Sequence, residues 1–252
     1  MDCRIKSGND EEMSMLHTFY PVLPDLGWLE RLVPLGVRTV QLRLKDADTL
    51  EINRQIEASL KLCAKHYCQL IVNDYWREAI ALGADYIHLG QEDLAGADLA
   101  AIKAAGLKLG ISTHSREELE IALKAGPDYV ALGPVYETKL KKMKWAPQGL
   151  ERVSEWKNLI SCPHDHDDFG LEQSKIINVI DSKKKERDAG GKPVSTFPHP
   201  ALVAIAGITV ERAPDVLAAG ADSLAVVTDI ITHPDPETRV REWLELVSAH
   251  TG

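Results

Sequence analysis

One pattern recurs four times along the chain: a predicted helix ends on a glycine, and a short apolar run follows it. The four copies are LGVRTVQL at 35–42, LGADYIHL at 82–89, AGPDYVAL at 125–132 and AGADSLAV at 219–226. Glycine tolerates the left-handed conformation just beyond a helix end, and each apolar run is long enough for a buried strand. Every copy therefore predicts the junction between a helix and the next strand of an α/β unit.

Four further apolar runs complete a set of eight predicted strands. They cover residues 18–23, 68–72, 107–111 and 202–206, so that the repeats supply the even-numbered strands. Helix starts fall between the strands, because Asp48 precedes Glu51, and Ser115 precedes Glu118, at the spacing of a capping box. Strands that alternate with helices predict a parallel α/β fold. Eight such units within 252 residues predict a single closed (β/α)8 TIM barrel.

The spacing of the repeats also predicts an insertion between strands six and seven. Gly36 and Gly83 are 47 residues apart, and Gly83 and Gly126 are 43 apart, whereas 94 residues separate Gly126 from Gly220. We place the extra chain at about 161–200, where charged runs, adjacent glycines and prolines interrupt the helix pattern. The predicted organisation is an N-terminal extension at 1–16 and one barrel domain at 17–252 that carries this insertion.

The charge balance argues against a nucleic-acid-binding protein. The chain carries 29 lysines and arginines against 38 aspartates and glutamates, a formal net charge of −9, so it offers no overall positive charge to nucleic-acid phosphates. No stretch approaches the roughly 20 apolar residues of a membrane span, and residues 1–15 lack the apolar run of a signal peptide. Four cysteines without a C-x-x-C pair are typical of free thiols in a reducing compartment. We therefore expect a cytoplasmic protein with no membrane partner, and leave homo-oligomer formation open.

Charged side chains follow the ends of several predicted strands, where barrel enzymes place their chemistry. At the end of strand two, alternation puts Gln41, Arg43 and Lys45 on one side, and burying two cations there favours an anionic partner. Strands three and four bring Asp74 and Asp93 to the same rim. Mg²⁺ in proteins is typically held by one or two carboxylates together with substrate phosphate oxygens. These residues predict a site for a metal-bridged diphosphate.

A second anion site is predicted where strands seven and eight end. The loops after these strands form the common phosphate site of such barrels, and Gly207 would let the backbone approach phosphate oxygens. Thr228 follows strand eight, and Ser112 ends strand five facing the same mouth. The lysine-rich loop after strand six, at 136–142, has the charges that a loop closing over an anion would need.

Six ordered motifs together resemble the thiamine-phosphate synthase family. They are QLRLK at 41–45, ND at 73–74, HLGQED at 88–93, GPVY at 133–136, APQGL at 146–150 and VAIAGI at 203–208. The resemblance implies a transferase that condenses 4-amino-2-methyl-5-hydroxymethylpyrimidine diphosphate with 4-methyl-5-(2-phosphooxyethyl)thiazole. Its products would be thiamine phosphate and diphosphate, so the implied partners are two small phosphorylated heterocycles.

The resemblance also implies a role for individual residues. It gives the pyrimidine diphosphate to Gln41, Leu42, Arg43, Leu44, Lys45, Asn73, Ser112 and Lys141, with Arg43, Lys45 and Lys141 catalytic. It gives the thiazole phosphate to Thr138, Lys139, Leu140, Gly207, Val227 and Thr228, and the cofactor Mg²⁺ to Asp74 and Asp93. The implied mechanism is a Mg-assisted dissociative displacement, in which diphosphate leaves before the thiazole nitrogen attacks the pyrimidine cation. One departure is that the family often has a second threonine where this chain has Leu140.

Two rival functions belong to other classes. A thiazole tautomerase has a similar sequence and would be an isomerase, with His114 as its proton shuttle because imidazole titrates near neutrality. A non-catalytic protein that binds thiamine precursors would need no metal-dependent turnover. Arg43, Lys45, Asp74 and Asp93 together favour the synthase, because neither rival has a diphosphate to release.

Overall fold

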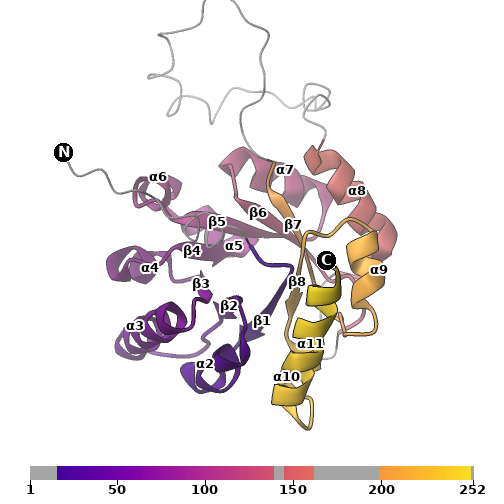
Figure 1. Ribbon diagram of the computed structural model, residues 1–252. Helices are drawn as coiled ribbons and strands as arrows, with labels where there is room; N and C mark the ends of the chain where they lie inside the picture. The colour runs from indigo at the N-terminus through magenta and orange to yellow at the C-terminus, as the bar shows by residue number, and fades with distance from the viewer. Residues whose placement is uncertain (1–15, 139–144, 162–198, 251–252) are drawn as a thin grey trace, which may run out of the picture.

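Eight parallel strands close into a barrel in the computed structural model, which describes residues 16–138, 145–161 and 199–250 (Figure 1). Each strand pairs with its neighbours in sequence, and β1 pairs with β8 to close the sheet. The predicted TIM barrel is therefore confirmed, and every predicted strand is present. The strands are β1 (Phe19–Leu23), β2 (Thr39–Leu42), β3 (Gln69–Asn73), β4 (Tyr86–Leu89), β5 (Lys108–Thr113), β6 (Tyr129–Leu132), β7 (Ala201–Ile205) and β8 (Ser223–Val226).

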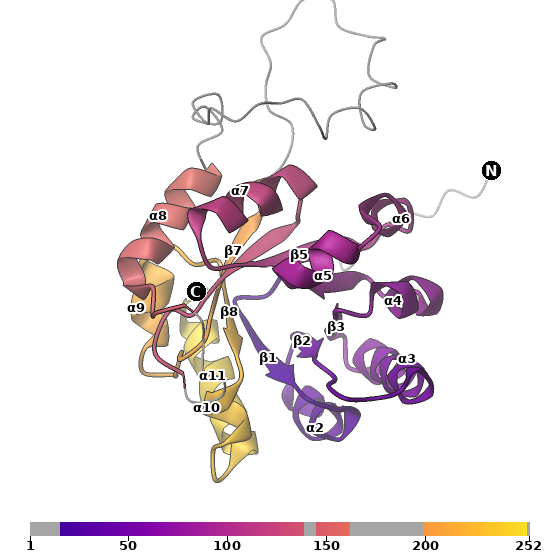
Figure 2. The ribbon, with the colours of Figure 1, turned by 180° about the vertical axis from the view of Figure 1, so that it is seen from behind.

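Helices connect the strands and form a ring around the barrel (Figures 1 and 2). The predicted capping residues begin two of them: Asp48 accepts a hydrogen bond from the Glu51 amide at 2.9 Å, and Ser115 accepts one from the Glu118 amide at 3.3 Å. The helices are α2 (Leu26–Leu32), η1 (Val33–Leu35), α3 (Thr49–Lys65), α4 (Trp76–Leu82), α5 (Gln91–Gly96), α6 (Leu99–Ala104), α7 (Arg116–Ala125), α8 (Gly149–Ser161), α9 (Ala213–Ala218), α10 (Thr228–Ile231) and α11 (Pro236–His250).

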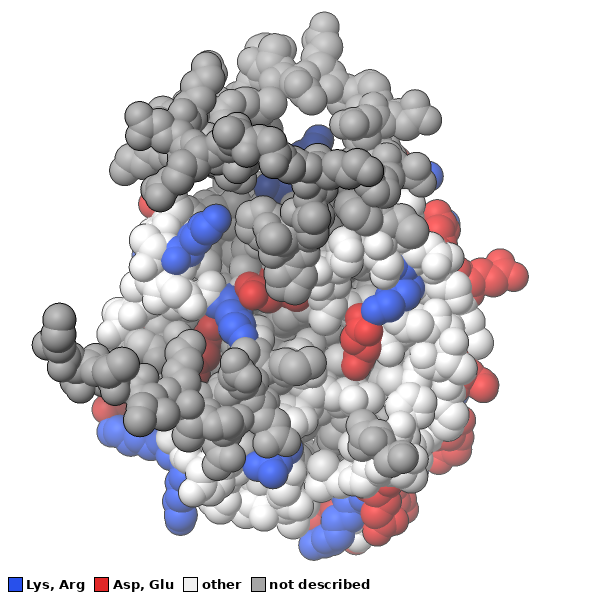
Figure 3. All heavy atoms as spheres, turned by 45° about the horizontal axis from the view of Figure 1, so that its top comes forward, with Lys and Arg blue, Asp and Glu red and all other residues white. Residues whose placement is uncertain are grey.

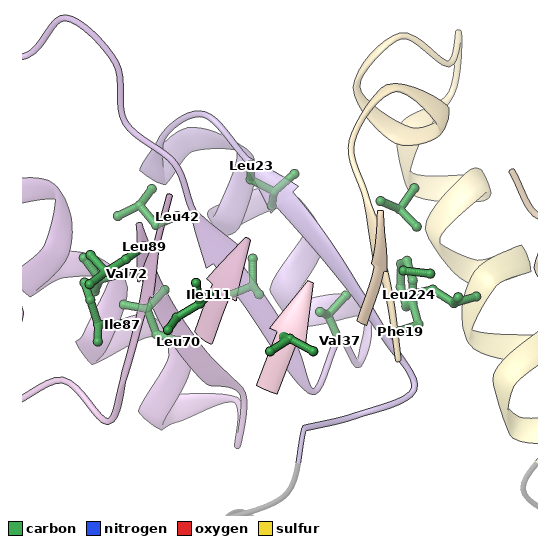
Figure 4. Close-up of a cluster of buried hydrophobic side chains, with 14 of the residues drawn as sticks. Phe19, Leu23, Val37, Leu42, Leu70, Val72, Ile87, Leu89, Ile111 and Leu224 are labelled. Atoms are coloured by element: carbon green, nitrogen blue, oxygen red, sulfur yellow. The ribbon is translucent and has the colours of Figure 1, made fainter. Parts of the chain in front are cut away.

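Two hydrophobic layers hold the fold together, because successive side chains of a strand point to opposite faces of the sheet. The outer layer lies between strands and helices, and Figure 4 shows part of it, with side chains from β1 to β5 and β8. Phe19 of β1 stacks there on Trp243 of α11 at 4.9 Å between ring centroids. The inner layer fills the barrel with Tyr20, Val22, Ile71, Tyr86, Tyr129, Ala131, Val203 and Ala225. The interior is therefore packed, as in other barrels of this type.

The predicted insertion falls between α8, which ends at Ser161, and β7, which begins at Ala201. Almost all of it, and of the predicted N-terminal extension, lies outside the described residues, so both remain predictions. In the described ranges no helix is long and apolar enough to cross a membrane. Figure 3 shows acidic and basic side chains interspersed on one face of the molecule.

Candidate active site

A cavity of about 540 Å³ opens where the strands end and their loops begin. Its size lies within the usual range for small-molecule sites. It brings together most of the residues that the sequence predicts for the site, although they are far apart in the chain. The predicted residues in its wall are Gln41, Arg43, Asn73, Asp74, Asp93, Ser112, Thr138, Gly207, Val227 and Thr228.

Other predicted residues lie away from this wall. Leu42 and Leu44 are buried in the hydrophobic layer between the barrel and its helices. Lys45 is exposed and does not line the cavity, so of Gln41, Arg43 and Lys45, which alternation predicted on one side, only the first two line it. Lys139, Leu140 and Lys141 lie outside the described residues.

Asp74 and Asp93 approach each other from the ends of neighbouring strands. Asp74 follows β3, and Asp93 lies in the first turn of α5, directly after β4. Burial and the negative charge of Asp93 raise the pKa of Asp74 to about 6, and the positive charge of Arg43 opposes this shift. Two ionised carboxylates this close repel each other, and a cation bound between them would stabilise the ionised form of both.

The carboxylates of Asp74 and Asp93 fit Mg²⁺ better than they fit a metal ion whose ligands all come from the protein. Among the described residues, no three His, Cys, Asp or Glu side chains gather into a metal-binding group. Mg²⁺ commonly takes one or two carboxylates and fills its other positions with water and substrate phosphates. The Asp74–Asp93 pair, with Arg43 beside it, therefore fits a cation that arrives with a phosphorylated substrate.

In the cavity wall, His88 on β4 links two neighbouring side chains by hydrogen bonds. Its Nδ1 lies 2.9 Å from the hydroxyl of Tyr129, and its Nε2 lies 2.8 Å from the Ser112 hydroxyl. Burial, and to a lesser extent the positive charge of Arg43, lowers the pKa of His88 to about 4. The imidazole is therefore neutral near pH 7 and carries one proton.

The buried His88 should make the protein sensitive to acid. Its pKa falls from 6.5 in a solvated chain to about 4 in the folded protein, so the unfolded state binds the extra proton first. Stability should drop as the pH falls from 6.5 towards 4, by about 2–3 kcal/mol for this group. Urea unfolding at pH 7 and pH 4.5 measures the loss. The variant His88→Gln should lose less unfolding free energy between these two pH values, because it lacks the contribution of His88. A loss equal to that of the wild type would contradict the prediction.

The loops that follow β6 and β7 pack closely against each other at Gly207, which has a φ of +70°. A Cβ atom at this position would lie 2.7 Å from the Glu137 carbonyl oxygen and 2.7 Å from the Cβ of Tyr136. The Tyr136 amide also donates a hydrogen bond to the Ala206 carbonyl at 3.1 Å. Glycine is therefore required both by the backbone conformation and by the approach of the loop that leads to Thr138.

Several residues of the cavity wall are not among those predicted to bind the substrates or Mg²⁺, and one of them, His114, was predicted only as the proton shuttle of the rival tautomerase. Gln91 donates a hydrogen bond to the Ser112 carbonyl at 2.6 Å. His114 lies 2.8 Å from a Glu118 carboxylate oxygen and stacks on Trp145 at 6.1 Å between ring centroids. Strand alternation could have indicated His88, which is two residues beyond the inward-facing Tyr86, but no sequence signal pairs His114 with Trp145.

The chain is similar over most of its length to known proteins of one family. A family model described as "Thiamine monophosphate synthase" matches residues 22–164. The chain is 52% identical to the thiamine-phosphate synthase of Rhizobium etli over 229 residues, which cover 91% of this chain and 94% of that protein. It is 40% identical to the thiamine-phosphate synthase of Neisseria meningitidis serogroup A over 228 residues, which cover 90% and 93% of the two chains.

A solved structure has a similar fold. It is a thiamine phosphate pyrophosphorylase from Pyrococcus furiosus, with a TM-score of 0.70 and 22% sequence identity. The likeness covers 96% of this chain and 100% of that chain. At this identity it supports the barrel architecture alone.

Proposed function

The chain belongs to the thiamine-phosphate synthase family, and from this premise we propose that it joins two phosphorylated heterocycles to make thiamine phosphate. The proposed substrates are 4-amino-2-methyl-5-hydroxymethylpyrimidine diphosphate and 4-methyl-5-(2-phosphooxyethyl)thiazole. Diphosphate is the second product. The reaction is an alkyl transfer, in which the pyrimidine methylene carbon exchanges its bond to oxygen for a bond to the thiazole nitrogen.

The observation that carries this proposal is that the residues predicted for the diphosphate and for the thiazole phosphate lie on opposite sides of one cavity. Asp74, Asp93 and Arg43 follow β3, β4 and β2, while Gly207 and Thr228 follow β7 and β8. In an eight-stranded barrel, β3 and β4 lie across the interior from β7 and β8. A diphosphate on one side and a phosphate on the other would therefore place two heterocycles between them.

In the proposed mechanism the protein supplies charge and position. Arg43, with Lys45 and Lys141 as further proposed cations, stabilises the negative charge that develops on the departing diphosphate. Mg²⁺ held by Asp74 and Asp93 would supply further neutralisation of that charge when bound. Gln41, Asn73 and Ser112 are proposed to orient the pyrimidine.

The thiazole would be held by its phosphate so that its nitrogen lies close to the carbon that loses diphosphate. We assign this phosphate to Thr138, Gly207 and Thr228, with Val227 and the loop residues 139–140 as further proposed contacts. Holding two reactants in one orientation replaces an encounter in solution, which is a large part of the barrier for such reactions. The scheme requires no nucleophile from the protein.

The two rivals fit the cavity less well. The contact of His114 with Glu118 would allow the proton transfer that a tautomerase needs. A tautomerase or a precursor-binding protein has no use for paired carboxylates beside an arginine, however. The named relatives are synthases, which also favours the transferase. We further propose the cytoplasm as its location, where thiols such as the buried Cys63 and Cys68 stay reduced.

The proposal is tested by incubating the purified protein with both heterocycles, with Mg²⁺ and with a chelator. We expect thiamine phosphate and diphosphate in equal amounts with Mg²⁺, and loss of nearly all product with the chelator, measured by mass spectrometry. A change in the thiazole substrate alone would instead identify an isomerase. Binding of both substrates without any product would support the precursor-binding protein.

A further inference from the structure

A chain of hydrogen bonds runs from the cavity wall into the barrel interior and is centred on Tyr129. The Tyr129 hydroxyl is hydrogen-bonded to the side chains of Tyr20 and Gln41 as well as to Nδ1 of His88. His88 continues the chain to Ser112 through its Nε2. Gln41 and Ser112 both line the cavity, as does His88, so cavity side chains on different strands are joined through the buried Tyr129.

The position of Tyr129 is fixed by its surroundings. Its ring is 1% exposed and stacks on the His88 imidazole with 5.6 Å between centroids and 17° between planes. Gly110 is its partner on the neighbouring strand, and a methyl group there would overlap the Tyr129 ring. The absence of a side chain at position 110 therefore provides the space in which the Tyr129 hydroxyl reaches its three partners.

Proton counting restricts how this network is arranged. A phenol has one proton to donate and two lone pairs that accept. Tyr20 is 1% exposed, and Tyr129 is the hydrogen-bond partner of its hydroxyl in the described part of the chain. Tyr20 must therefore donate to Tyr129 to satisfy its own proton. The single proton of Tyr129 is then left for either His88 or Gln41.

Each choice gives the two cavity side chains opposite roles. If Tyr129 donates to Nδ1 of His88, then Nε2–H donates to Ser112, and the Ser112 hydroxyl is left to donate into the cavity. Gln41 must then donate its amide to Tyr129, which leaves its carbonyl oxygen as an acceptor. If Tyr129 donates to Gln41 instead, His88 takes the other tautomer, Ser112 becomes the acceptor and Gln41 becomes the donor.

We propose that Tyr129 is a positioning residue that couples Gln41 to Ser112, so that the cavity always presents one donor and one acceptor from this pair. An aminopyrimidine edge, with an amine next to an unprotonated ring nitrogen, has the matching donor and acceptor. This deepens the proposed function and rests on it in one respect, namely that Gln41 and Ser112 contact the pyrimidine. The coupling itself is a property of the ligand-free protein.

The first test reads the tautomer of His88 by its imidazole ¹⁵N chemical shifts at pH 8, without ligand. Gln41→Glu offers Tyr129 only an acceptor, so it should place the proton of His88 on Nδ1. Gln41→Met offers no partner, so Tyr129 should donate to His88, whose proton then lies on Nε2. Adding Tyr129→Phe to each variant should remove the difference between them.

The same tautomer in both Gln41 variants, or a doubly protonated His88, would overturn the coupling. Because no substrate is present, this result does not depend on the proposed function. Wild-type protein that shows the coupling but makes no thiamine phosphate would count against the proposed function alone.

The second test compares steady-state kinetics of Tyr129→Phe with those of Tyr86→Phe. Tyr86 is a matched control, because it lies in the same inner layer but is hydrogen-bonded to Gln69 instead. Loss of one donor–acceptor match should raise the KM for the pyrimidine diphosphate about tenfold in Tyr129→Phe, with the KM for the thiazole phosphate within twofold of wild type. Tyr86→Phe should change neither value. An equal rise in both KM values in Tyr129→Phe would indicate general damage to the cavity and would overturn the positioning role.

Discussion

Replacing Asp93 by alanine is expected to lower Mg²⁺-dependent formation of thiamine phosphate about a thousandfold, with the barrel still folded. Asp93 is one of two carboxylates at the rim, and the other, Asp74, follows the neighbouring strand. With one carboxylate left, the cation that neutralises the departing diphosphate would lose a protein ligand. The substitution should remove stabilisation of the transition state more than it weakens substrate binding, so kcat should fall more than the KM for the pyrimidine diphosphate rises.

The fold should tolerate this substitution because Asp93 is exposed in the short helix α5 and contributes little to the hydrophobic layers. Removing its charge also relieves Asp74, whose pKa is raised partly by Asp93 and should fall towards its ordinary value. Carboxyl ¹³C shifts of Asp74 would follow that change independently of turnover. The two readouts separate loss of the site from loss of the fold.

A matched control for Asp93→Ala is Asp85→Ala, because the two aspartates flank opposite ends of β4. Asp85 is exposed and directly precedes β4, whereas Asp93 lies beyond its other end. Both variants lose one negative charge, and only Asp93→Ala should lose activity in a coupled assay for diphosphate. Turnover of Asp93→Ala close to that of wild type would remove Asp93 from the proposed metal site.

The architecture could be predicted from local patterns because each α/β unit carries its own signals. Glycine at the helix end and an apolar run placed the even-numbered strands, and two capping boxes placed the starts of α3 and α7. These signals depend on neighbouring residues only. Closure into a barrel followed from the number of units and the chain length rather than from any single contact.

The residues at the end of β2 show where strand alternation no longer predicts the direction of a side chain. Gln41 lies in the strand, and the Arg43 amide still donates to the Leu23 carbonyl at 2.8 Å, so the pleat continues to Arg43. Lys45 lies beyond this last ladder bond, and its side chain is exposed outside the cavity wall. Alternation is a property of paired strands, so it indicates the direction of the Arg43 side chain but not that of Lys45.

The network around Tyr129 could not have been predicted in the same way. Tyr129 is on β6, His88 on β4 and Gln41 on β2, so their contacts exist only after the barrel has closed. In the sequence Tyr129 is part of an apolar run, and nothing there distinguishes a tyrosine that fills space from one that donates a hydrogen bond. The space that Gly110 leaves for its ring is also a feature of strand register.

A large loss of stability is expected from Arg239→Ala on α11. Arg239 forms two hydrogen bonds with Asp229, at 2.8 and 2.9 Å, and it also pairs with Glu242 and Glu211. The side chains of Arg239 and Asp229 are 12% and 9% exposed. Removing the cation leaves Asp229 buried, with the Trp243 indole as its remaining side-chain donor among the described residues. Breaking a buried ion pair in this way costs about 3–5 kcal/mol.

The charge of Asp229, rather than lost packing, should account for most of this cost. Arg239→Met keeps much of the aliphatic stem, and adding Asp229→Asn to it removes the unpaired carboxylate, so the double variant should regain a large part of the stability. Arg241→Ala is the control, since Arg241 is exposed on the same helix and should cost less than about 0.5 kcal/mol. Urea unfolding at pH 7 measures all four proteins.

The same cluster lies directly behind the proposed thiazole phosphate site. Asp229 follows Thr228, and Glu211 follows β7 in the loop that contains Gly207, so Arg239 ties together the two loops that would hold the phosphate. Arg239→Met should therefore raise the KM for the thiazole phosphate several-fold below its unfolding temperature, with the pyrimidine KM nearly unchanged. If stability falls and neither KM moves, Arg239 serves the fold alone. If the double variant is no more stable than Arg239→Met, the unpaired carboxylate is not the cause of the loss.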